Sequence, residues 1–178
     1  AVKNLLQKEK ENPFNIEIEN SLFLEFYGIL LGDGWLSKLK YKNKSIYLIG
    51  ISGHKRLDKE FHLYCKNNIY LLFNRNAYIK ELKSCNGEEI LFSHKRLHKF
   101  LNENIGFPVG LKKSLKIKKE ILDMGYDKVK YILRGIFDTD GSFYFDKTPV
   151  GRPYPCISIT MKQPILMQQI YSLLIDKG

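Results

Sequence analysis

The sequence predicts an α+β fold made of two related halves. An apolar, glycine-spaced stretch that ends in Asp-Gly occurs twice, as FYGILLGDG at 26–34 and LRGIFDTDG at 133–141, and short alternating strands follow each copy. The acids Asp33 and Asp140 lie about a hundred positions apart, which suits two halves related by pseudo-two-fold symmetry better than a solenoid. At 178 residues, with 44% hydrophobic and 13% aromatic residues, the chain is long and apolar enough to bury a core.

The first unit is expected to span 21–107, after a polar and weakly patterned N-terminal extension over 1–20. Ser21 is a candidate cap for a helix from Leu22 to Gly32. The next two segments are alternating or β-branched and predict paired strands. These two strands are 35–42 and 44–52, joined by a Lys-Asn-Lys turn.

An amphipathic helix follows over 54–69, with Leu57, Phe61 and Tyr64 on its apolar face. Two short strands and a second amphipathic helix, which ends at Gly106, complete the unit. These elements are expected over 77–83, 88–94 and 95–106. On this last helix His94 and His98 have an i,i+4 spacing, which we interpret as a solvated or phosphate-facing surface rather than a metal site.

Residues 108–125 are dense in lysine and predict a basic connector that ends in a short helix. The second unit, 126–178, then repeats the order of the first. Its expected elements are helix 127–140, strands 141–147 and 153–162, and helix 163–178. Compared with the first unit it lacks two strands and a closing helix. Either the sequence is a fragment, or the second half is abbreviated.

Charge and targeting signals narrow the class of partner. Lys and Arg outnumber Asp and Glu by 29 to 19, giving a net charge of +10. This excess favours a polyanionic partner, either nucleic acid or an acidic membrane surface, over a merely solubilising charge. No apolar run approaches the roughly 18 to 20 residues of a membrane span, and no signal core begins the chain. Three separated cysteines predict neither a disulfide framework nor a zinc site. We therefore expect an intracellular protein of the cytoplasm, nucleoid or organelle matrix, neither secreted nor bound to membranes.

The repeated stretch carries small residues at helical spacing. Gly28 and Gly32 are four apart in the first copy, and Gly135 and Thr139 are four apart in the second. Residues at i and i+4 share a helix face, and small residues there let two backbones approach closely. We expect the two helices to pack through these faces, so that their C-terminal ends converge.

Converging ends would bring Asp33 and Asp140 side by side. Two neighbouring carboxylates repel each other unless a cation lies between them, and Mg²⁺ or Mn²⁺ suits such oxygen ligands. Paired acids holding a divalent metal on a basic protein predict phosphodiester hydrolysis. A simple helix-to-strand turn would explain one Asp-Gly pair, but not two with the same following strands.

These two stretches resemble the signature helices of the LAGLIDADG homing endonucleases. The resemblance runs from about Leu22 to the end and includes the strands after each motif. It implies two pseudo-symmetric αββαββα halves that form a saddle of antiparallel sheets on double-stranded DNA, with the two motif helices at the centre. It also implies a metal held by Asp33 and Asp140, with the backbone carbonyls of Gly32 and Thr139 completing the site. One motif acid departs from the pattern, because Asp138 is matched by Leu31 in the first copy.

Strand alternation selects candidate DNA-reading residues, since strands in the major groove read base edges with one face. In the second copy Ser142, Tyr144 and Asp146 share one face, and Phe143 and Phe145 are expected to face the core. In the first copy the matching face carries Trp35, Ser37, Leu39 and Tyr41, while Lys38 and Lys40 have the opposite phase and are expected to reach phosphates.

Further basic residues are expected at the groove or at phosphates, where they give affinity but little sequence information. They are Arg75 and Lys80, taken to lie on the third strand, and the connector lysines Lys112, Lys113, Lys116, Lys118 and Lys119. The family also places a lysine or glutamine near each metal. Lys162 is the candidate in the second unit and Lys95 is another, whereas Gly53 and His54 stand at the equivalent place in the first unit.

The leading hypothesis is thus a monomeric, site-specific double-strand DNA endonuclease that uses Mg²⁺ or Mn²⁺. An intron RNA maturase on the same scaffold and a non-catalytic DNA-binding protein are the alternatives. Intact acids at both motif ends disfavour the non-catalytic protein.

Overall fold

The computed structural model describes residues 16–83, 85–146 and 151–175. Residues 1–15 of the expected N-terminal extension therefore lie outside the described residues, as do the last residues of the expected strand 141–147 and helix 163–178. The described helices and strands follow the expected order, and the α+β prediction is confirmed. None of the helices in this part of the chain is long and apolar enough to cross a membrane.

The first half contains one antiparallel sheet with the order β1-β2-β4-β3. Its elements are α2 (Ser21–Gly32), β1 (Gly34–Tyr41), β2 (Lys44–His54), α3 (Lys59–Phe73), β3 (Tyr78–Glu81), β4 (Gly87–Ser93), α4 (Lys95–Lys99) and the π-helical turn η2 (Phe100–Ile105). Leu36, Ile49, Ile51, Ile90 and Phe92 are buried together on one face of this sheet, against the helices. The opposite face carries the alternate residues of each strand. None of the described helices covers it, so it is the helix-free face of this sheet.

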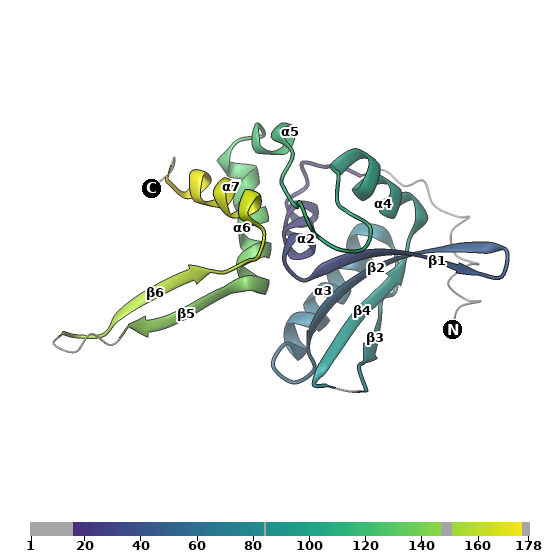
Figure 1. Ribbon diagram of the computed structural model, residues 1–178, viewed down its shortest axis with the longest axis horizontal. Coiled ribbons are helices and arrows are strands. Elements are labelled where there is room, and N and C mark those ends of the chain that lie inside the picture. Colours follow the sequence, from purple (N-terminus) through teal and green to yellow (C-terminus); the bar gives the residue numbers. More distant parts are fainter. Residues whose placement is uncertain (1–15, 84, 147–150, 176–178) are drawn as a thin grey trace.

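The second half is smaller in the described residues. After α5 (Lys119–Leu122) come α6 (Tyr126–Asp140), β5 (Gly141–Asp146), β6 (Tyr154–Ile159) and α7 (Pro164–Ile175), and β5 pairs with β6 in a two-stranded antiparallel sheet. Figure 1 shows α2 and α6 at the centre, with the two sheets extending to opposite sides of them. The helices α4, α5 and α7 lie on one side of the molecule, away from the outer ends of the strands.

Three sequence-based details of the helices are wrong. The cap of α2 is Asn20, not Ser21, because the Asn20 side chain accepts hydrogen bonds from the amides of Leu22 and Phe23. Helix α3 begins after the expected position, which leaves Leu57 outside it and 82% exposed. The buried face of α3 is instead made by His62, Cys65, Asn68, Ile69 and Phe73.

The histidines of α4 are not solvated. His94 and His98 are both buried, the His94 ring accepts a hydrogen bond from the Leu97 amide, and burial lowers the pKa of His94 to about 4. The predicted stop at Gly106 is confirmed, since this residue has a φ of 85° and its amide bonds to the carbonyl of Leu101.

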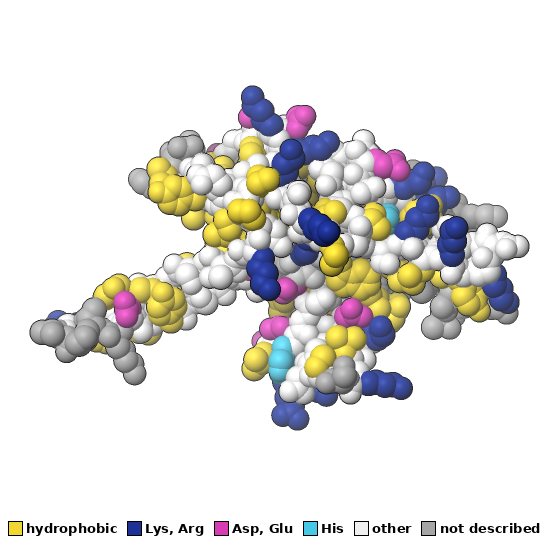
Figure 2. Space-filling model, in the orientation of Figure 1, with side chains coloured by type: hydrophobic (Ala, Val, Ile, Leu, Met, Phe, Trp, Pro, Cys, Tyr) yellow, Lys and Arg dark blue, Asp and Glu magenta, His cyan; other side chains and the backbone are white. Residues whose placement is uncertain are grey.

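The aromatic pair of the second sheet is not in the core. Phe143 and Phe145 are 60% and 57% exposed, and Figure 2 shows hydrophobic side chains gathered along this hairpin. They do share a face with Ile157 across the strand pair, as alternation predicts. Among the described residues no helix covers that face, so its apolar side chains stay in contact with solvent.

Candidate active site between the two motif helices

The two motif helices pack against each other through their small residues. A Cβ on Gly28 would overlap the carbonyl oxygen of Ile132 and lie 3.1 Å from the Cα of Gly135. A Cβ on Gly135 would in turn overlap the carbonyl oxygen of Glu25 and lie 2.7 Å from the amide nitrogen of Ile29. Gly28 thus faces Ile132, three residues before Gly135, and Gly135 faces Glu25, three residues before Gly28. This reciprocal contact is a local two-fold relation between α2 and α6.

The C-terminal ends of these helices converge on the two acids. A Cβ on Gly32 would overlap the Thr139 hydroxyl and the Asp140 carboxylate, so a larger residue at position 32 would have to displace these two side chains. Asp33 is the C-cap residue of α2, and Asp140 is the last residue of α6. The four small residues of the motif helices therefore deliver both acids to one place.

Each acid is anchored in the same way to the second strand of its own half. The carbonyl of Asp33 accepts a hydrogen bond of 3.0 Å from the amide of Ser52, and the carbonyl of Asp140 accepts one of 3.3 Å from the amide of Thr160. These bonds connect the end of each motif helix to β2 or to the end of β6. The main chain at each acid is consequently fixed to the second strand of its own half.

The electrostatics of the pair are those of two crowded acids. Burial, and then the charge of Asp140, raise the pKa of Asp33 from 3.8 to about 6. Burial also raises the pKa of Asp140, whereas the hydroxyl of Thr139, which donates to its carboxylate at 3.1 Å, lowers it. The site thus favours a positive charge between the acids.

Lys112 brings a positive charge to the end of α2. Its ammonium donates to the carbonyl oxygen of Gly32, and also to those of Leu31 at 3.2 Å and Leu30 at 3.4 Å. These are carbonyls of the last turn of α2, which carries the negative end of the helix dipole, and the carbonyl of Leu30 also accepts from the amide of Asp33. Burial lowers the pKa of Lys112, while Asp33 and Asp140 raise it. Lys112 is therefore part of the acidic site, not the outward phosphate contact that its lysine-rich context predicts.

A divalent cation fits this donor set. Among the described residues no group of three or more His, Cys, Asp or Glu is placed to hold a metal, so a cation here would use the carboxylates of Asp33 and Asp140. Hard oxygen ligands, completed by backbone carbonyls and water, suit Mg²⁺ or Mn²⁺. The ammonium of Lys112 on the Gly32 carbonyl shows that this oxygen already attracts a cation.

A charge network around the buried Glu25 links the two halves. Glu25 of α2 is 3% exposed, accepts a hydrogen bond of 2.5 Å from Tyr64, and lies 3.5 Å from the guanidinium of Arg134. Arg134 is also 3.8 Å from Asp138, so the additional acid of the second motif belongs to this network. A lone acid inside an otherwise apolar helix is the sequence signal for it, since a buried charge requires a partner.

A second buried pair, His62 and Glu88, lies behind Gly53. The Nδ1 of His62 contacts the Glu88 carboxylate, and a Cβ on Gly53 would overlap the Nε2 of His62. His62 and Asp58 both act on the pKa of Asp33, which places them near the site. The imidazole thus fills the space that a side chain at position 53 would occupy.

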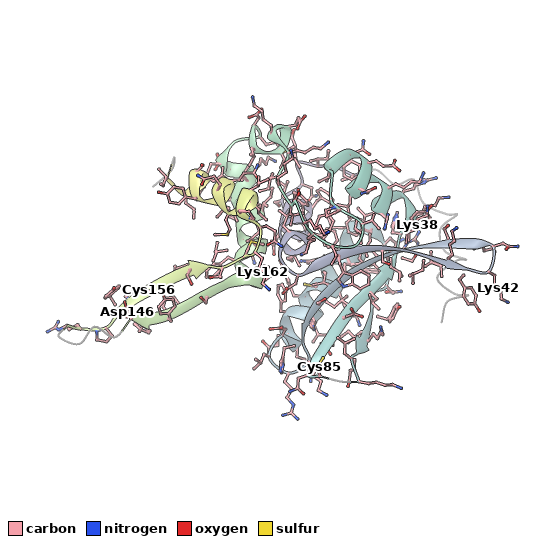
Figure 3. All side chains as sticks on the ribbon, viewed as in Figure 1. Lys38, Lys42, Cys85, Asp146, Cys156 and Lys162 are labelled. Carbon is pink, nitrogen blue, oxygen red and sulfur yellow. The ribbon has the colours of Figure 1, made fainter. Side chains whose placement is uncertain are left out.

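The two lysines predicted to lie near the metal, Lys162 and Lys95, are in different parts of the structure. Lys162 lies two residues after Thr160, just beyond the end of β6. Figure 3 shows it at the end of the hairpin nearest the central helices, whereas Asp146 lies far along the hairpin. Lys95 is placed elsewhere, because its ammonium lies 5.8 Å from the ring centroid of Tyr47. Tyr47 is four residues along β2 from Ile51, or roughly 13 Å at the usual strand rise. A position for Lys95 beside the acids is therefore wrong.

The candidate DNA contacts follow the strand alternation in part. Trp35, Ser37, Leu39 and Tyr41 share the helix-free face of the first sheet with Lys80, which pairs with Glu89 at 3.3 Å. Lys38 and Lys40 have the opposite phase, and the Lys38 ammonium lies 5.4 Å from the Tyr47 ring.

In the second sheet Ser142 bonds to Ser158, and Asp146 accepts from Tyr154. Both of these candidates therefore already have partners across the strand pair. Tyr144 shares their face and is 49% exposed.

Two residues expected to contact DNA, Arg75 and Lys116, lie in other places than the sequence predicts. Arg75 precedes β3 instead of lying on it, and its charge acts on the buried His94. Lys116 adjoins Ile117, whose backbone makes two hydrogen bonds of 2.8 Å with the Gln169 side chain of α7. This part of the connector lies on the helical side of the molecule (Figure 1), away from the outer ends of the strands. Lys113 is exposed and adjoins Lys112 at the acidic site.

Comparison with solved structures identifies the fold. A variant of I-DmoI in complex with its target DNA and Mn matches with a TM-score of 0.59 and 18% identity, over 90% of this chain and 77% of that chain. The meganuclease I-SmaMI bound to uncleavable DNA matches with a TM-score of 0.52 and 12% identity, over 89% and 73% of the two chains. The chain has the LAGLIDADG homing-endonuclease fold.

The LAGLIDADG meganuclease I-CpaMI bound to uncleaved DNA matches this LAGLIDADG fold with a TM-score of 0.50 and 13% identity, over 86% and 71% of the two chains. The resemblance of the two motifs is thus confirmed at the level of fold. The chain spans between 71% and 77% of the length of these three solved structures, and 64% of the length of a further I-DmoI variant structure. No family model and no curated protein sequence matches it.

The raised pKa of Asp33 predicts a pH-dependent stability. A carboxyl whose pKa is higher in the folded protein favours folding while it is protonated, so its contribution is present below about pH 4 and is lost as the pH rises through about 6. In EDTA we expect Asp33→Asn to have a higher melting temperature than the wild type at about pH 7.5, and the two to converge near pH 4. Calorimetry across this range measures the difference. The exposed Asp123→Asn should follow the wild type, and parallel curves for wild type and Asp33→Asn would contradict the prediction.

Proposed function

We propose that the chain is a site-specific double-strand DNA endonuclease of the homing type, which hydrolyses phosphodiesters with Mg²⁺ or Mn²⁺ held between Asp33 and Asp140. The observation that carries this proposal is the convergence of two carboxylates at the ends of two packed helices, between two antiparallel sheets. A net charge of +10 and the DNA bound to I-DmoI, I-CpaMI and I-SmaMI support a DNA substrate.

The chain's own groups have distinct roles in this proposal. Asp33 and Asp140 bind the cation, and the carbonyls of Gly32 and Thr139 contribute further oxygens. When bound, the cation activates water and stabilises the negative charge that develops on the phosphate. Since hydrogen bonds from the amides of Ser52 and Thr160 hold the main chain at both acids, the backbone of the site is formed before the substrate arrives.

The helix-free faces of the sheets would read the DNA. Ser37 and Tyr41 in the first sheet and Tyr144 in the second lie on such faces, where side chains can reach base edges in the major groove. The two sheets extend in opposite directions from the acids (Figure 1). Contacts on both sides of the acids would place a single phosphodiester region at the centre, which is the geometry that site-specific cleavage needs.

The decisive experiment uses a random library of duplex DNA with Mg²⁺. We expect cleavage of both strands within one related set of sequences and no cleavage in EDTA. Sequencing of the cut ends identifies the set. Absence of cleavage, together with tight binding of intron RNA, would favour a maturase on the same scaffold, and tight DNA binding without cleavage would favour a non-catalytic DNA-binding protein.

The position of Lys113 predicts its contribution to DNA binding. Each phosphate neutralised by a lysine adds about 0.9 to the slope of log affinity against log salt. We expect Lys113→Met to lower this slope by about one, because Lys113 is exposed beside the acidic site. Lys116→Met is the matched control and should leave the slope unchanged, since Lys116 lies on the helical side. Fluorescence anisotropy at several salt concentrations measures both, and equal slopes for the two variants would contradict the assignment.

A further inference from the structure

The connector holds Lys112 against the acidic site from a separate part of the chain. Two residues earlier, the amide of Gly110 donates to the carbonyl of Leu36 at 2.9 Å, and Val109 forms a parallel bridge with Leu36. The connector is thus fixed to the edge of β1, and the Lys112 side chain reaches from there to the last turn of α2. Its position is built by β1, α2 and the connector together.

The ammonium uses an oxygen that the proposed metal would also use. The carbonyl of Gly32 accepts from Lys112, and the Asp33 and Asp140 charges act on the same ammonium. A carbonyl oxygen has two lone pairs, but a divalent cation and an ammonium on one oxygen would be close neighbours. Like charges at that separation in a partly buried site repel strongly, so the two cations exclude each other at this oxygen.

We propose that Lys112 is an internal cation that holds the acidic site together and competes with the divalent metal for the Gly32 carbonyl. The inference rests on the proposed function, because it assumes that Asp33 and Asp140 bind metal. With Lys112 in place, its positive charge acts on both acids while its ammonium bonds to the carbonyls at the end of α2. Metal binding then requires the ammonium to leave, which makes Lys112 a positioning residue and sets the metal affinity below that of the bare acids.

The chemical reactivity of the lysines tests this competition in the wild-type chain. Trace acetylation followed by mass spectrometry compares Lys112 with the exposed Lys116 on the same connector. Without metal we expect Lys112 to react about tenfold more slowly, because it is partly buried with three carbonyl partners. Saturating Mn²⁺ should raise the reactivity of Lys112 toward that of Lys116 and leave Lys116 unchanged.

Direct Mn²⁺ binding, measured by water proton relaxation, supplies the second readout. We expect Lys112→Met to bind Mn²⁺ about tenfold more tightly than wild type, and Lys116→Met to bind it as wild type does. Asp140→Asn should abolish binding in either background. Both results together support the competition.

The competition by Lys112 and the metal site itself can fail separately in these experiments. Mn²⁺ binding that depends on Asp140 but leaves the reactivity of Lys112 unchanged would overturn the competition and leave the proposed function intact. Absence of Mn²⁺ binding by both the wild type and Lys112→Met would overturn the metal site and the proposed function with it.

Discussion

Replacing Asp33 or Asp140 by asparagine is expected to abolish DNA cleavage while DNA binding is retained. Asparagine keeps the shape of the side chain but removes the negative charge that holds a divalent cation. The loss of one electrostatic group at a reacting centre typically costs about 10²–10³ in rate, and a lost metal ligand acts on every later step. We therefore expect at least this loss from each substitution, measured as single-turnover cleavage in Mg²⁺.

The matched control is Asp138→Asn in the same motif. Asp138 lies on the side of α6 that faces Arg134, so its loss should change cleavage by no more than a few-fold. Binding measured in EDTA should stay near wild type for all three variants, because none of them removes a side chain that is proposed to contact DNA directly. Specific cleavage that survives both Asp33→Asn and Asp140→Asn would overturn the assignment of the metal ligands.

The convergence of the acids could be predicted from the sequence because it is encoded locally and twice. Small residues four apart define a helix face, and the same face in two copies can pack on itself. The structure brings Gly28 to Gly135 and Gly32 to Thr139, with one acid directly beyond each face. The strand alternation after each motif was equally predictable, because its period of two is a property of the backbone.

The role of Lys112 could not be predicted in this way. Its partners Leu30 to Gly32 are about eighty positions away, and the contact depends on how the connector crosses the edge of β1. In the sequence Lys112 is one of several neighbouring lysines, and nothing local separates it from Lys113 or Lys116. The same reason explains the wrong position of Lys95, since only the tertiary fold determines that it lies over Tyr47.

The exposure of Phe143 and Phe145 shows a second limit of prediction from the sequence. Their alternation correctly places both rings on one face of the hairpin, apart from Tyr144 and Asp146. Whether that face is buried depends on what packs against it, which a strand pattern does not contain. In the first half, α3 packs on the equivalent face. Its Cys65 and Ile69 belong to the same buried cluster as the apolar residues of the sheet.

Adding one methyl group at the centre of the helix pair is expected to have the largest effect on stability. In Gly135→Ala the new Cβ would overlap the Glu25 carbonyl oxygen and lie 2.7 Å from the Ile29 amide nitrogen. Both are backbone atoms, so relief requires α2 and α6 to separate instead of a side chain to turn. Overpacking of this kind costs about 1–3 kcal/mol, partly offset by the better helix propensity of alanine, about 1 kcal/mol. Chemical denaturation measures the net loss.

Gly28→Ala should behave alike, because Gly28 faces Ile132 and Gly135 across the same contact. Once one methyl group has moved the helices apart, the second finds part of its space already made. The double variant is therefore expected to lose less stability than the two single variants added together, as neighbouring sites that share one backbone shift do. The exposed Lys130→Ala on α6 controls for helix propensity and should stay within about 0.5 kcal/mol. If the stability losses of the two single variants add up to that of the double variant, the two glycines act on separate contacts. The separation of Asp33 and Asp140 would then not be set by a single distance between α2 and α6.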